Sequence, residues 1–536
     1  MKKKSKAGAK EIHEKLGQIA AATGAPPPGD GRTLPSISVN QTTGPLAREV
    51  AQCLCRAPLF RSGGSLVTVD ELTGNILPMT ADGFPGWHHQ FFTFHTGEGE
   101  NRKTVDLNPN QVRRILASEA LRAHVRELRA VNLLRLPVWR GKGADRTIEL
   151  LPKGYDEETK TLTVPLLDYD LDWQLEDAHA WLDATFGTFP FFERGELFTR
   201  RSFAAVVAAM LGDFCVNLLP DGAVRPLVLV DGNQVKLGKS LLVRMMLSPV
   251  HGRVGEGSKP GSDDEMRKIF DSAARAGKAY VILDDLHSLA SHDLNHFTSS
   301  PTHEARVMNT QTLLNCPNVW QVFGTGKDIK LTEDLERRIL AIDLFASDEW
   351  RTRKVANPWT NPRIFSPEYR ANACAALWAI VQNWNDSGRP ICAEAILDSF
   401  EDYAEIVGSI VVAARIVNPF GRRENTRGGN YAGRALINAV CALASICEPG
   451  DQLTTVQIIA QLDSDGTLDV VVPSAKNELG QRQRLGWKLQ ALRGNEYTDT
   501  RGRKFQFGHR DDAAGSKYTL YFLPDAGEPD APPLPG

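Results

Sequence analysis

The sequence predicts an α/β core built around a largely parallel sheet, with a smaller α+β unit before it and a helix-and-strand unit after it. Three observations lead to this prediction. Apolar segments typical of strands end in polar residues after positions 226–230, 280–283 and 320–323. Segments with helical spacing lie between these strands, as in successive strand–helix–strand units. Residues 451–524 combine short helices with a terminal strand pattern, which indicates a separate unit at the C-terminal end.

Length and composition limit the class of protein. A chain of 536 residues is too long for one ordinary domain, so we expect roughly two to four. Hydrophobic residues at 42% and charged residues at 24% exclude collagen-like, fully disordered and coiled-coil proteins. The net charge of −3 gives no sign of a polyanionic partner for the chain as a whole, although a local basic patch is compatible with it.

No segment of the sequence predicts a membrane span or a secretion signal. The longest uncharged apolar stretch, at positions 435–447, has 13 residues, whereas a membrane span needs about 18 to 20. The basic N-terminus is not followed by an apolar signal segment. We therefore expect a soluble, cytoplasmic protein without a membrane partner.

Cysteine and histidine positions predict neither disulfides nor a metal centre. Cys53 and Cys55 form the only close pair among eight cysteines, and no CxxC repeat occurs, so we expect all eight to be reduced. Twelve histidines include two groups without the spacing of a metal motif. These groups are His88, His89 and His95, and His287, His292, His296 and His303.

Changes in composition and spacing predict the order of the units. Strand patterns at 65–69 and 162–167 and helical spacing at 111–134 define an N-terminal α+β unit. Residues 87–94 fit a buried strand better than an aromatic stacking surface for nucleic acid. The expected boundaries are a disordered tail at 1–34, the α+β unit at 35–165, the α/β core at 166–349, a helical region at 350–450, the C-terminal unit at 451–524 and a loose tail at 525–536.

A candidate phosphate-binding loop follows the first core strand. This loop ends in Gly238, Lys239 and Ser240, and an apolar helix begins at once. Loop and helix N–H groups suit phosphate oxygens, the Lys reaches the β and γ phosphates of ATP, and the Ser hydroxyl holds Mg²⁺. The loop departs from GxxxxGK[ST] because Asn233 stands where Gly is usual and Gly232 comes one residue early. Asn tolerates positive φ better than most residues, so a turn at this position is compatible with Asn233.

Two acids and two arginines complete the pattern. Asp284 and Asp285 end an apolar strand 45 residues after Lys239, where Asp284 would hold Mg²⁺ through water and Asp285 would position or deprotonate the attacking water. A third strand is followed by Arg337 and Arg338, one of which could stabilise phosphoryl charge in a neighbouring subunit. In isolation, two strand-end acids and an arginine pair are usually solvated surface residues.

The order of these elements resembles AAA+ ATPases, in particular the superfamily 3-like helicase modules of phage and mobile-element replication proteins. The segments that carry the resemblance are Thr188-Phe-Pro-Phe-Phe-Glu, Val230-Asp-Gly-Asn-Gln with Gly-Lys-Ser, Gly324-Thr-Gly, Asp334-Leu-x-Arg-Arg and Ser399-Phe-Glu-Asp-Tyr. Residues 480–522 are similar to the winged-helix unit that closes such proteins. The resemblance covers about residues 160–522 and implies an AAA+ P-loop core, a helical lid and a C-terminal winged-helix domain.

The resemblance also assigns roles to individual residues and shows three departures. Lys327 lies where the family usually has the Asn that senses the γ-phosphate, and Arg337 or Arg338 would act in trans. The departures are Asn233 in place of Gly, Asp285 where Glu is commoner, and Lys327 in place of Asn. They bear on the rate of ATP hydrolysis rather than on nucleotide binding. No primase motif is apparent.

Two segments are candidate contacts for DNA. Between Lys476 and Lys517 ten basic residues outnumber five acidic ones, a local charge of +5. A helix followed by a basic turn is a duplex-binding layout, although a solvated surface on a packing domain gives the same pattern. The candidate contacts here are Arg484, Lys488, Arg501, Arg503 and Lys504. In the interval at 287–311, which carries pore hairpins in ring helicases, the candidates are His303 and Arg306.

The leading hypothesis is an oligomeric ATPase of this class, a hexamer, that uses ATP and Mg²⁺ to move along or unwind DNA. It would act in a bacterial cell during replication of a phage or other mobile element, alone or with other replication proteins. An alternative is a nucleotide-gated, DNA-binding initiator or loader with slow ATP turnover. A third interpretation is an AAA+ remodeller of proteins, for which DNA stimulation would not depend on residues 476–522.

Overall fold

The computed structural model describes residues 34–523, apart from positions 56, 63–64, 71–73, 194, 277, 290–291, 307–312, 319, 332–334, 336–337, 347–357, 421–430, 473–477, 491, 494–495, 500, 509 and 513–514. Its elements pack around separate hydrophobic cores in the N-terminal, central and C-terminal parts of the chain. The N-terminal and C-terminal tails that the sequence predicts at 1–34 and 525–536 fall, except for Leu34, outside the described residues.

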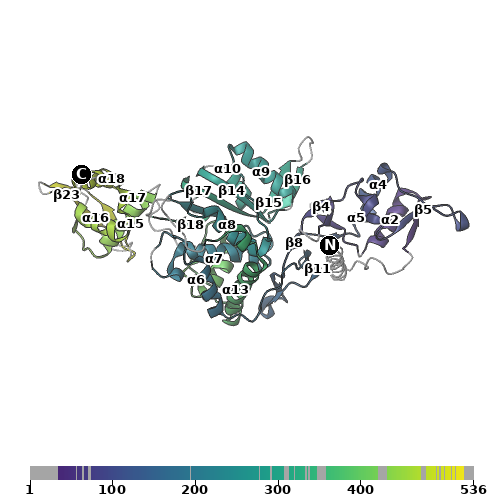
Figure 1. The fold of residues 1–536 in the computed structure, drawn as a ribbon, viewed down its shortest axis with the longest axis horizontal. Helices are drawn as coiled ribbons and strands as arrows, with labels where there is room; N and C mark the ends of the chain where they lie inside the picture. The colour runs from purple at the N-terminus through teal and green to yellow at the C-terminus, as the bar shows by residue number, and fades with distance from the viewer. Residues whose placement is uncertain are drawn as a thin grey trace, which may run out of the picture.

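The N-terminal part contains short strands in three small sheets and four short helices (Figure 1). The strand orders are β1-β5-β6, β4-β3-β2-β7 and β11-β12-β8. Helix α4 begins at a capping box in which Asn108 and Gln111 exchange side-chain-to-backbone hydrogen bonds, with Pro109 at its first position. The elements are β1 (Ser36–Ser38), α2 (Thr43–Leu54), β2 (Phe60–Ser62), β3 (Ser65–Val69), β4 (Ile76–Pro78), α3 (Phe84–His88), β5 (Thr93–Thr96), β6 (Lys103–Thr104), α4 (Pro109–Leu116), α5 (Glu119–Arg122), β7 (Arg126–Glu127), β8 (Ala130–Asn132), β11 (Gly154–Asp156) and β12 (Thr161–Thr163).

Two predictions for this part were wrong. The helical spacing at 111–134 continues only to Arg122, after which β7 pairs with β2 and β8 pairs with β12. Residues 87–94 are the end of α3, a turn and the start of β5 rather than one strand, because Pro85 opens a helix there. Phe84, Phe92 and Phe94 are fully buried, so these aromatic side chains form core rather than a stacking surface.

The central part is a parallel four-stranded sheet in the order β14-β17-β13-β18, covered by helices on both faces (Figure 1). Alternate residues of β13 point to opposite faces: Val228 and Val230 pack with α7 and α8, whereas Leu227 and Leu229 pack with α9 and α10. The elements are β9 (Pro137–Arg140), β10 (Thr147–Leu150), α6 (Leu175–Phe186), α7 (Arg201–Phe214), β13 (Leu227–Gly232), α8 (Lys239–His251), α9 (Asp263–Arg275), β14 (Tyr280–Leu289), α10 (His292–Ser299), β15 (Thr302–Arg306), β16 (Leu313–Pro317), β17 (Gln321–Leu331), β18 (Ile339–Leu344), α12 (Asn361–Ile364), α13 (Pro367–Asp386) and α14 (Glu401–Ala413).

The helices expected to form a separate region at 350–450 share the core of the sheet instead. Tyr369 of α13 donates its hydroxyl to the Met245 carbonyl of α8 at 3.0 Å, and Tyr403 of α14 donates to the Ala208 carbonyl of α7 at 2.9 Å. The β9–β10 hairpin also belongs to this core, because Trp139 Nε1 donates to the Leu218 carbonyl at 2.9 Å. The predicted boundaries at 165 and 350 therefore do not coincide with the packing units.

The C-terminal part has four helices and a five-stranded antiparallel sheet in which β19, β23, β21 and β20 are neighbours in that order and β22 pairs with β23. Helix α15 packs in this core, so the unit begins before the predicted position 451. The elements are α15 (Tyr431–Ser445), β19 (Gln452–Thr454), α16 (Thr455–Ser464), α17 (Leu468–Val471), α18 (Glu478–Gln490), β20 (Glu496–Thr498), β21 (Lys504–Phe507), β22 (Arg510–Asp512) and β23 (Gly515–Phe522).

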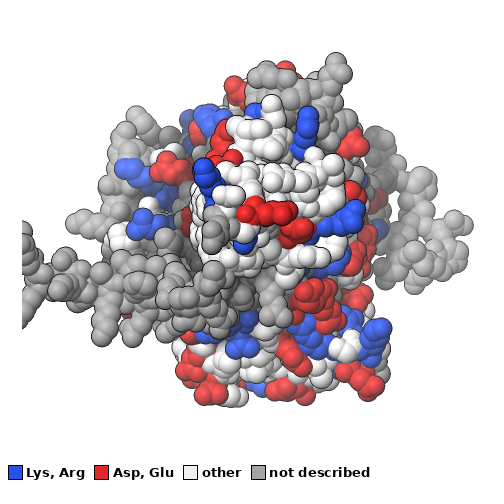
Figure 2. Space-filling model, turned by 90° about the vertical axis from the view of Figure 1, so that its right-hand side faces the viewer, with Lys and Arg blue, Asp and Glu red and all other residues white. Residues whose placement is uncertain are grey.

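Charged side chains are interspersed on the end of the molecule that lies at the right of Figure 1, where blue and red atoms alternate in Figure 2. This mixture agrees with the small net charge of the chain, −3. No helix among the described residues combines the length and the apolar character that a bilayer crossing requires.

Candidate functional site

The loop between β13 and α8 has the backbone of a tight cradle at the carboxyl end of the sheet. Lys236 and Gly238 adopt left-handed conformations, with φ of 61° and 87°, and Gly238 is the residue before the first turn of α8. A Cβ at Gly232 would lie 2.7 Å from Leu237 Cδ1 and 3.3 Å from Lys239 Cδ, so a larger residue would require these side chains to move. The early glycine at 232 therefore allows the loop to fold closely over the strand end.

Asn233 fixes the loop in a way that the sequence did not suggest. Asn233 is compatible with a positive φ, but its φ is not positive, and that conformation is taken by Lys236 and Gly238. Its amide instead donates to the Ala346 carbonyl at 2.8 Å and accepts from the Ala346 N–H at 3.1 Å. A glycine at this position could not make either bond. The amide thus clamps the loop to the chain that follows β18.

Lys239 and Ser240 open α8 directly after the loop. Lys239 Nζ donates to the Gln234 carbonyl at 2.8 Å, so the ammonium group lies over the loop that precedes it. Ser240 Oγ donates to Asp284 Oδ1 at 3.1 Å, which joins the helix start to β14 across the sheet edge. Free N–H groups and the dipole at a helix N-terminus favour an anion at this position.

Asp284 of β14 connects the neighbouring strand β17 to the start of α8. Its Oδ1 accepts hydrogen bonds from Ser240 Oγ, from the Asp285 N–H at 3.1 Å and from Thr325 Oγ1 of β17. The segment after α8 also lies against it, because a Cβ at Gly257 would be 2.9 Å from Asp284 Cβ. Ser240 and Asp284, which the sequence pairs as Mg²⁺ ligands, are therefore brought together.

Asp285 has a different environment from Asp284. It adopts a left-handed backbone with φ of 55°, and its exposed carboxylate forms an ion pair with Lys259. The hydrogen bond from Lys259 holds the pKa of Asp285 below its usual range. The expectation that a strand ends at these acids was wrong: β14 shifts register after Leu283 and continues to Leu289 alongside β17.

The third strand presents Thr325, rather than Lys327, to the acid. Strand β17 continues to Leu331, and the Lys327 side chain is exposed two residues beyond Thr325. The role of Lys327 as a γ-phosphate sensor stays a prediction. Thr325 lies in the Gly324-Thr-Gly segment that carries part of the family resemblance, and this was the signal available for it.

The arginine pair precedes β18. Arg337 lies outside the described residues, and Arg338 is half-buried with a buried Nε. An arginine that reaches a neighbouring subunit has to lie at the surface of its own subunit. Arg338 fulfils this condition only in part, because it is half-buried. The trans-acting role of either residue stays a prediction.

The interval at 287–311 includes β15, one strand of a hairpin. His303 in this strand does not have the environment of a DNA contact. Strands β15 and β16 pair antiparallel, with Arg306 opposite Leu313 at the end next to positions 307–312. His303 Nε2 lies 2.8 Å from Asp271 Oδ1, and its ring stands edge-on against Phe297 and Trp320. His303 is therefore a packing residue, which corrects its prediction as a DNA contact. The side chain of Arg306 lies outside the described residues.

In the C-terminal unit, α18 presents an aromatic and two basic residues away from its core. Leu485 and Leu489 are fully buried, whereas Arg484 is exposed and Trp487 is 75% exposed. Lys488 is half-buried, and this burial lowers its pKa. Arg501 and Lys504 are exposed in and after the turn between β20 and β21. Four of the five predicted basic contacts thus lie near solvent, together with Trp487.

Arg503, the fifth predicted contact, serves the fold instead. Its guanidinium donates to Asp499 Oδ2 at 2.8 Å and to the Ala444 and Cys447 carbonyls at 2.9 and 3.0 Å. The guanidinium carbon also lies 4.4 Å from the ring centroid of Phe522. Arg503 therefore caps the carboxyl end of α15, and its prediction as a DNA contact was wrong.

Comparison with known proteins gives weak similarity. No protein-family model matches the chain, and no curated protein does. A solved structure titled the A form apo structure of the NrS-1 C-terminal region is 11% identical, with 70% of this chain and 83% of that chain covered and a TM-score of 0.28. A second, designated 305–718 of the same region, is 10% identical, with 86% and 97% covered and a TM-score of 0.29. TM-scores this low establish no shared fold.

Proposed function

We propose that this chain is an ATP- and Mg²⁺-dependent ATPase of the AAA+ class that acts on DNA, with the loop at 232–240 as its phosphate cradle. The observation that supports this most is the contact of Ser240 and Thr325 with Asp284 beside the first turn of α8. A hydroxyl and a carboxylate at hydrogen-bonding distance, next to a helix N-terminus, form an oxygen-rich edge suited to a hard cation and phosphate.

The residues of this loop and of the adjoining strands fit both Mg²⁺ and the phosphates of ATP. Ser240 and Asp284 would hold Mg²⁺ and water, and the ion would supply charge neutralisation between the β and γ phosphates. Gly232 and Gly238 leave the loop backbone close to the strand end, which lets N–H groups face phosphate oxygens. Lys239 Nζ, now on the Gln234 carbonyl, would exchange that neutral acceptor for a phosphate oxygen.

The DNA-directed part of the proposal depends on the C-terminal unit and the β15–β16 hairpin. Four basic residues and Trp487 lie at or near the surface around α18 and the β20–β21 turn, a combination that suits nucleic-acid phosphates and bases. We propose that the chain assembles as a hexamer, that this hairpin faces the pore and that the C-terminal unit acts as a winged-helix domain. The process would be replication of a phage or mobile element.

A second candidate, a nucleotide-gated initiator or loader with slow turnover, is favoured by one observation. Lys259 neutralises Asp285, the residue expected to position or deprotonate the attacking water. If this pair persists after ATP binds, water activation is weak and binding rather than hydrolysis becomes the output.

DNA-stimulated ATP hydrolysis and strand displacement separate these possibilities. We expect wild-type protein to hydrolyse ATP and to unwind forked DNA, Lys239→Ala to lose hydrolysis by at least about a hundredfold, and Lys268→Ala, on the exposed face of α9, to match wild type. Lys239→Ala protein that hydrolyses ATP at the wild-type rate would exclude the proposed cradle. DNA binding that depends on ATP without unwinding would favour the initiator or loader.

A further inference from the structure

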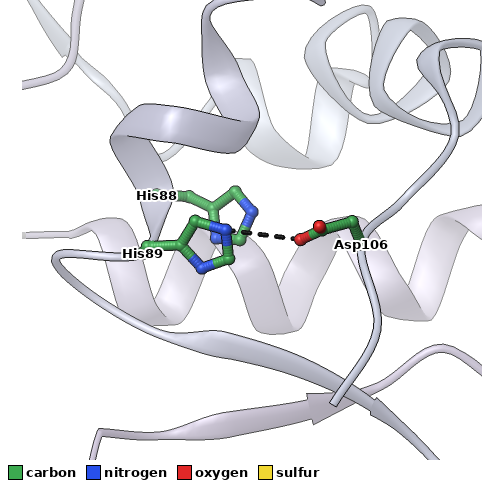
Figure 3. Close-up of side chains that lie close together, drawn as sticks. All are labelled: His88, His89 and Asp106. Carbon is green, nitrogen blue, oxygen red and sulfur yellow. Dashed lines mark ion pairs between the residues drawn. The ribbon is translucent and has the colours of Figure 1, made fainter.

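A group of metal-ligating side chains lies in the N-terminal part, apart from the phosphate cradle. Figure 3 shows His88 and His89 at the end of α3, with Asp106 reaching toward them from the segment between β6 and α4. One nitrogen of each imidazole and one oxygen of Asp106 lie within 4.8 Å of one another. His89 Nε2 and Asp106 Oδ1 are 3.3 Å apart. Eighteen positions separate His88 from Asp106, so the sequence spacing of the histidines alone did not indicate a site.

The fold fixes one ligand and leaves two near solvent. His88 is 1% exposed, and its Nδ1 lies 3.3 Å from the Phe92 carbonyl. Phe84, Phe92 and Phe94 hold its ring, with centroids at 5.1, 5.1 and 5.0 Å. His89 and Asp106 have side chains that are 45% and 69% exposed. A rigid inner ligand with two adjustable outer ligands is suited to closing around an ion that arrives from solvent.

The anchoring of Asp106 supports the same conclusion. Its neighbours Val105 and Leu107 pack against the core of the N-terminal part, and the Val105 N–H donates to the Phe94 carbonyl at 3.0 Å. The backbone is therefore fixed on both sides of the carboxylate. An exposed ion pair of His89 with Asp106 would by itself contribute little to stability and would not need the buried imidazole beside it.

We propose that His88, His89 and Asp106 bind a divalent transition-metal ion of the zinc type, with water completing the coordination. Two imidazoles and a carboxylate suit Zn²⁺, whereas Mg²⁺ and Ca²⁺ prefer an all-oxygen shell. Ligand atoms around tetrahedral zinc lie about 3.4 Å apart for bonds of about 2.1 Å. Movement of the exposed His89 and Asp106 side chains is sufficient to reach that separation. The bound ion would join the end of α3 to the segment leading into α4.

Calorimetric titration of the chelator-treated full chain with ZnCl₂ tests this site. His89→Ala and Asp106→Asn change exposed residues, so both variants are expected to fold. His124→Ala is the matched control, because His124 is an exposed histidine of the same part of the chain that lies outside the proposed site. Its Nδ1 is 2.8 Å from the Ala120 carbonyl. We expect Zn²⁺ to bind wild type and His124→Ala alike, His89→Ala to lose one bound ion per chain, and Asp106→Asn to bind at least about tenfold more weakly.

Cysteines and the other histidines are competing zinc ligands, and the same titration detects them. Equal stoichiometry and affinity in wild type, His89→Ala and Asp106→Asn would place any zinc elsewhere and overturn the proposal, as would the absence of zinc binding to wild type. Lys239→Ala is expected to bind Zn²⁺ like wild type, so the outcome is independent of the phosphate cradle. A rise in the melting temperature with Zn²⁺, absent from His89→Ala, is the second expected readout.

Discussion

Thr325 is a residue of the proposed phosphate cradle that the structure, rather than the sequence, identifies. Its hydroxyl and that of Ser240 both donate to Asp284 Oδ1, which fixes the carboxylate between β17 and α8. Thr325→Val keeps the shape of the side chain and removes the hydroxyl. We expect it to lower ATP hydrolysis about 10- to 100-fold, as for other residues that orient a metal ligand.

Thr325→Ser is the control for that prediction, because it keeps the hydroxyl and loses only a methyl group. Steady-state ATPase assays at saturating Mg²⁺ should show near wild-type activity for Thr325→Ser. Equal activity of Thr325→Val and wild type would mean that the hydroxyl has no positioning role.

We expect Glu193 to make the stability of the central part depend on pH. Burial, followed by the charge of Asp343, raises its pKa, even though Ser202 Oγ donates to Glu193 Oε1 at 2.9 Å. The folded chain therefore holds this proton more tightly than the unfolded chain, and ionisation destabilises the fold as the pH rises above about 4.3. Glu193→Gln keeps the acceptor oxygen for Ser202 and has no charge.

We expect Glu193→Gln to be more stable than wild type at neutral pH, with a difference that shrinks as the pH falls toward the unfolded-state pKa. Urea unfolding followed by circular dichroism at about pH 4.5 to 8, above the unfolded-state pKa of about 4.3, measures the free energy of unfolding of both proteins. A constant difference over that range would contradict the raised pKa as its cause.

At the residue scale, the sequence predicted which side chains lie close together where their positions at strand and helix ends determine this. Ser240 and Asp284 were predicted as partners because strand ends of a parallel sheet meet at one edge, and they are hydrogen-bonded. Asn233 and Lys327 could not be placed, since one depends on the chain after β18 and the other on how far β17 continues. The first is a contact between segments far apart in the sequence, and the second depends on the pairing of β17 with β14.

At the scale of elements, α18 carries the most exposed aromatic side chain near the proposed DNA contacts. Trp487 is 75% exposed between Arg484 and Lys488. Stacking on a base contributes about 1 to 3 kcal/mol, so Trp487→Ala should weaken DNA binding about tenfold or more. Fluorescence anisotropy with labelled single-stranded and duplex DNA measures this. Ile446→Ala removes another apolar side chain of the same unit, 74% exposed, and should leave affinity unchanged.

The turn between β20 and β21 allows a paired comparison of two arginines. Arg501 is exposed, so Arg501→Ala should reduce the slope of log affinity against log salt by about 1 without loss of stability. Arg503→Ala should instead destabilise the C-terminal unit by about 1 to 3 kcal/mol, because it removes a charged donor from the buried Asp499 and the cap of α15. Salt titrations and thermal unfolding distinguish them; the reverse pattern would reverse these assignments.

Element boundaries were the least predictable part of the fold. The apolar pattern at 280–283 indicates the start of β14 but not its continuation, because the residues after Asp285 extend the strand only by pairing with β17 after a register shift. In the same way, α15 has the apolar spacing of any helix, and only its packing with α16 and α17 assigns it to the C-terminal core.

At the scale of the whole molecule, the described residues form a central sheet with helices on both faces and two flanking parts with their own cores. The α/β character of the centre and the mixed character of both flanks were predicted from periodicity alone. The role of the N-terminal part was not, and the His88, His89 and Asp106 group is its one proposed chemistry.

Binding of ATP with Mg²⁺, measured by isothermal titration calorimetry, tests the central claim most directly. The account predicts that wild-type protein binds one nucleotide per chain, that binding requires Mg²⁺ for full affinity, and that Lys239→Ala binds at least about tenfold more weakly while Lys268→Ala is unchanged. Absence of binding to wild-type protein, or equal affinity in Lys239→Ala, would contradict the assignment of the loop at 232–240 as a phosphate cradle.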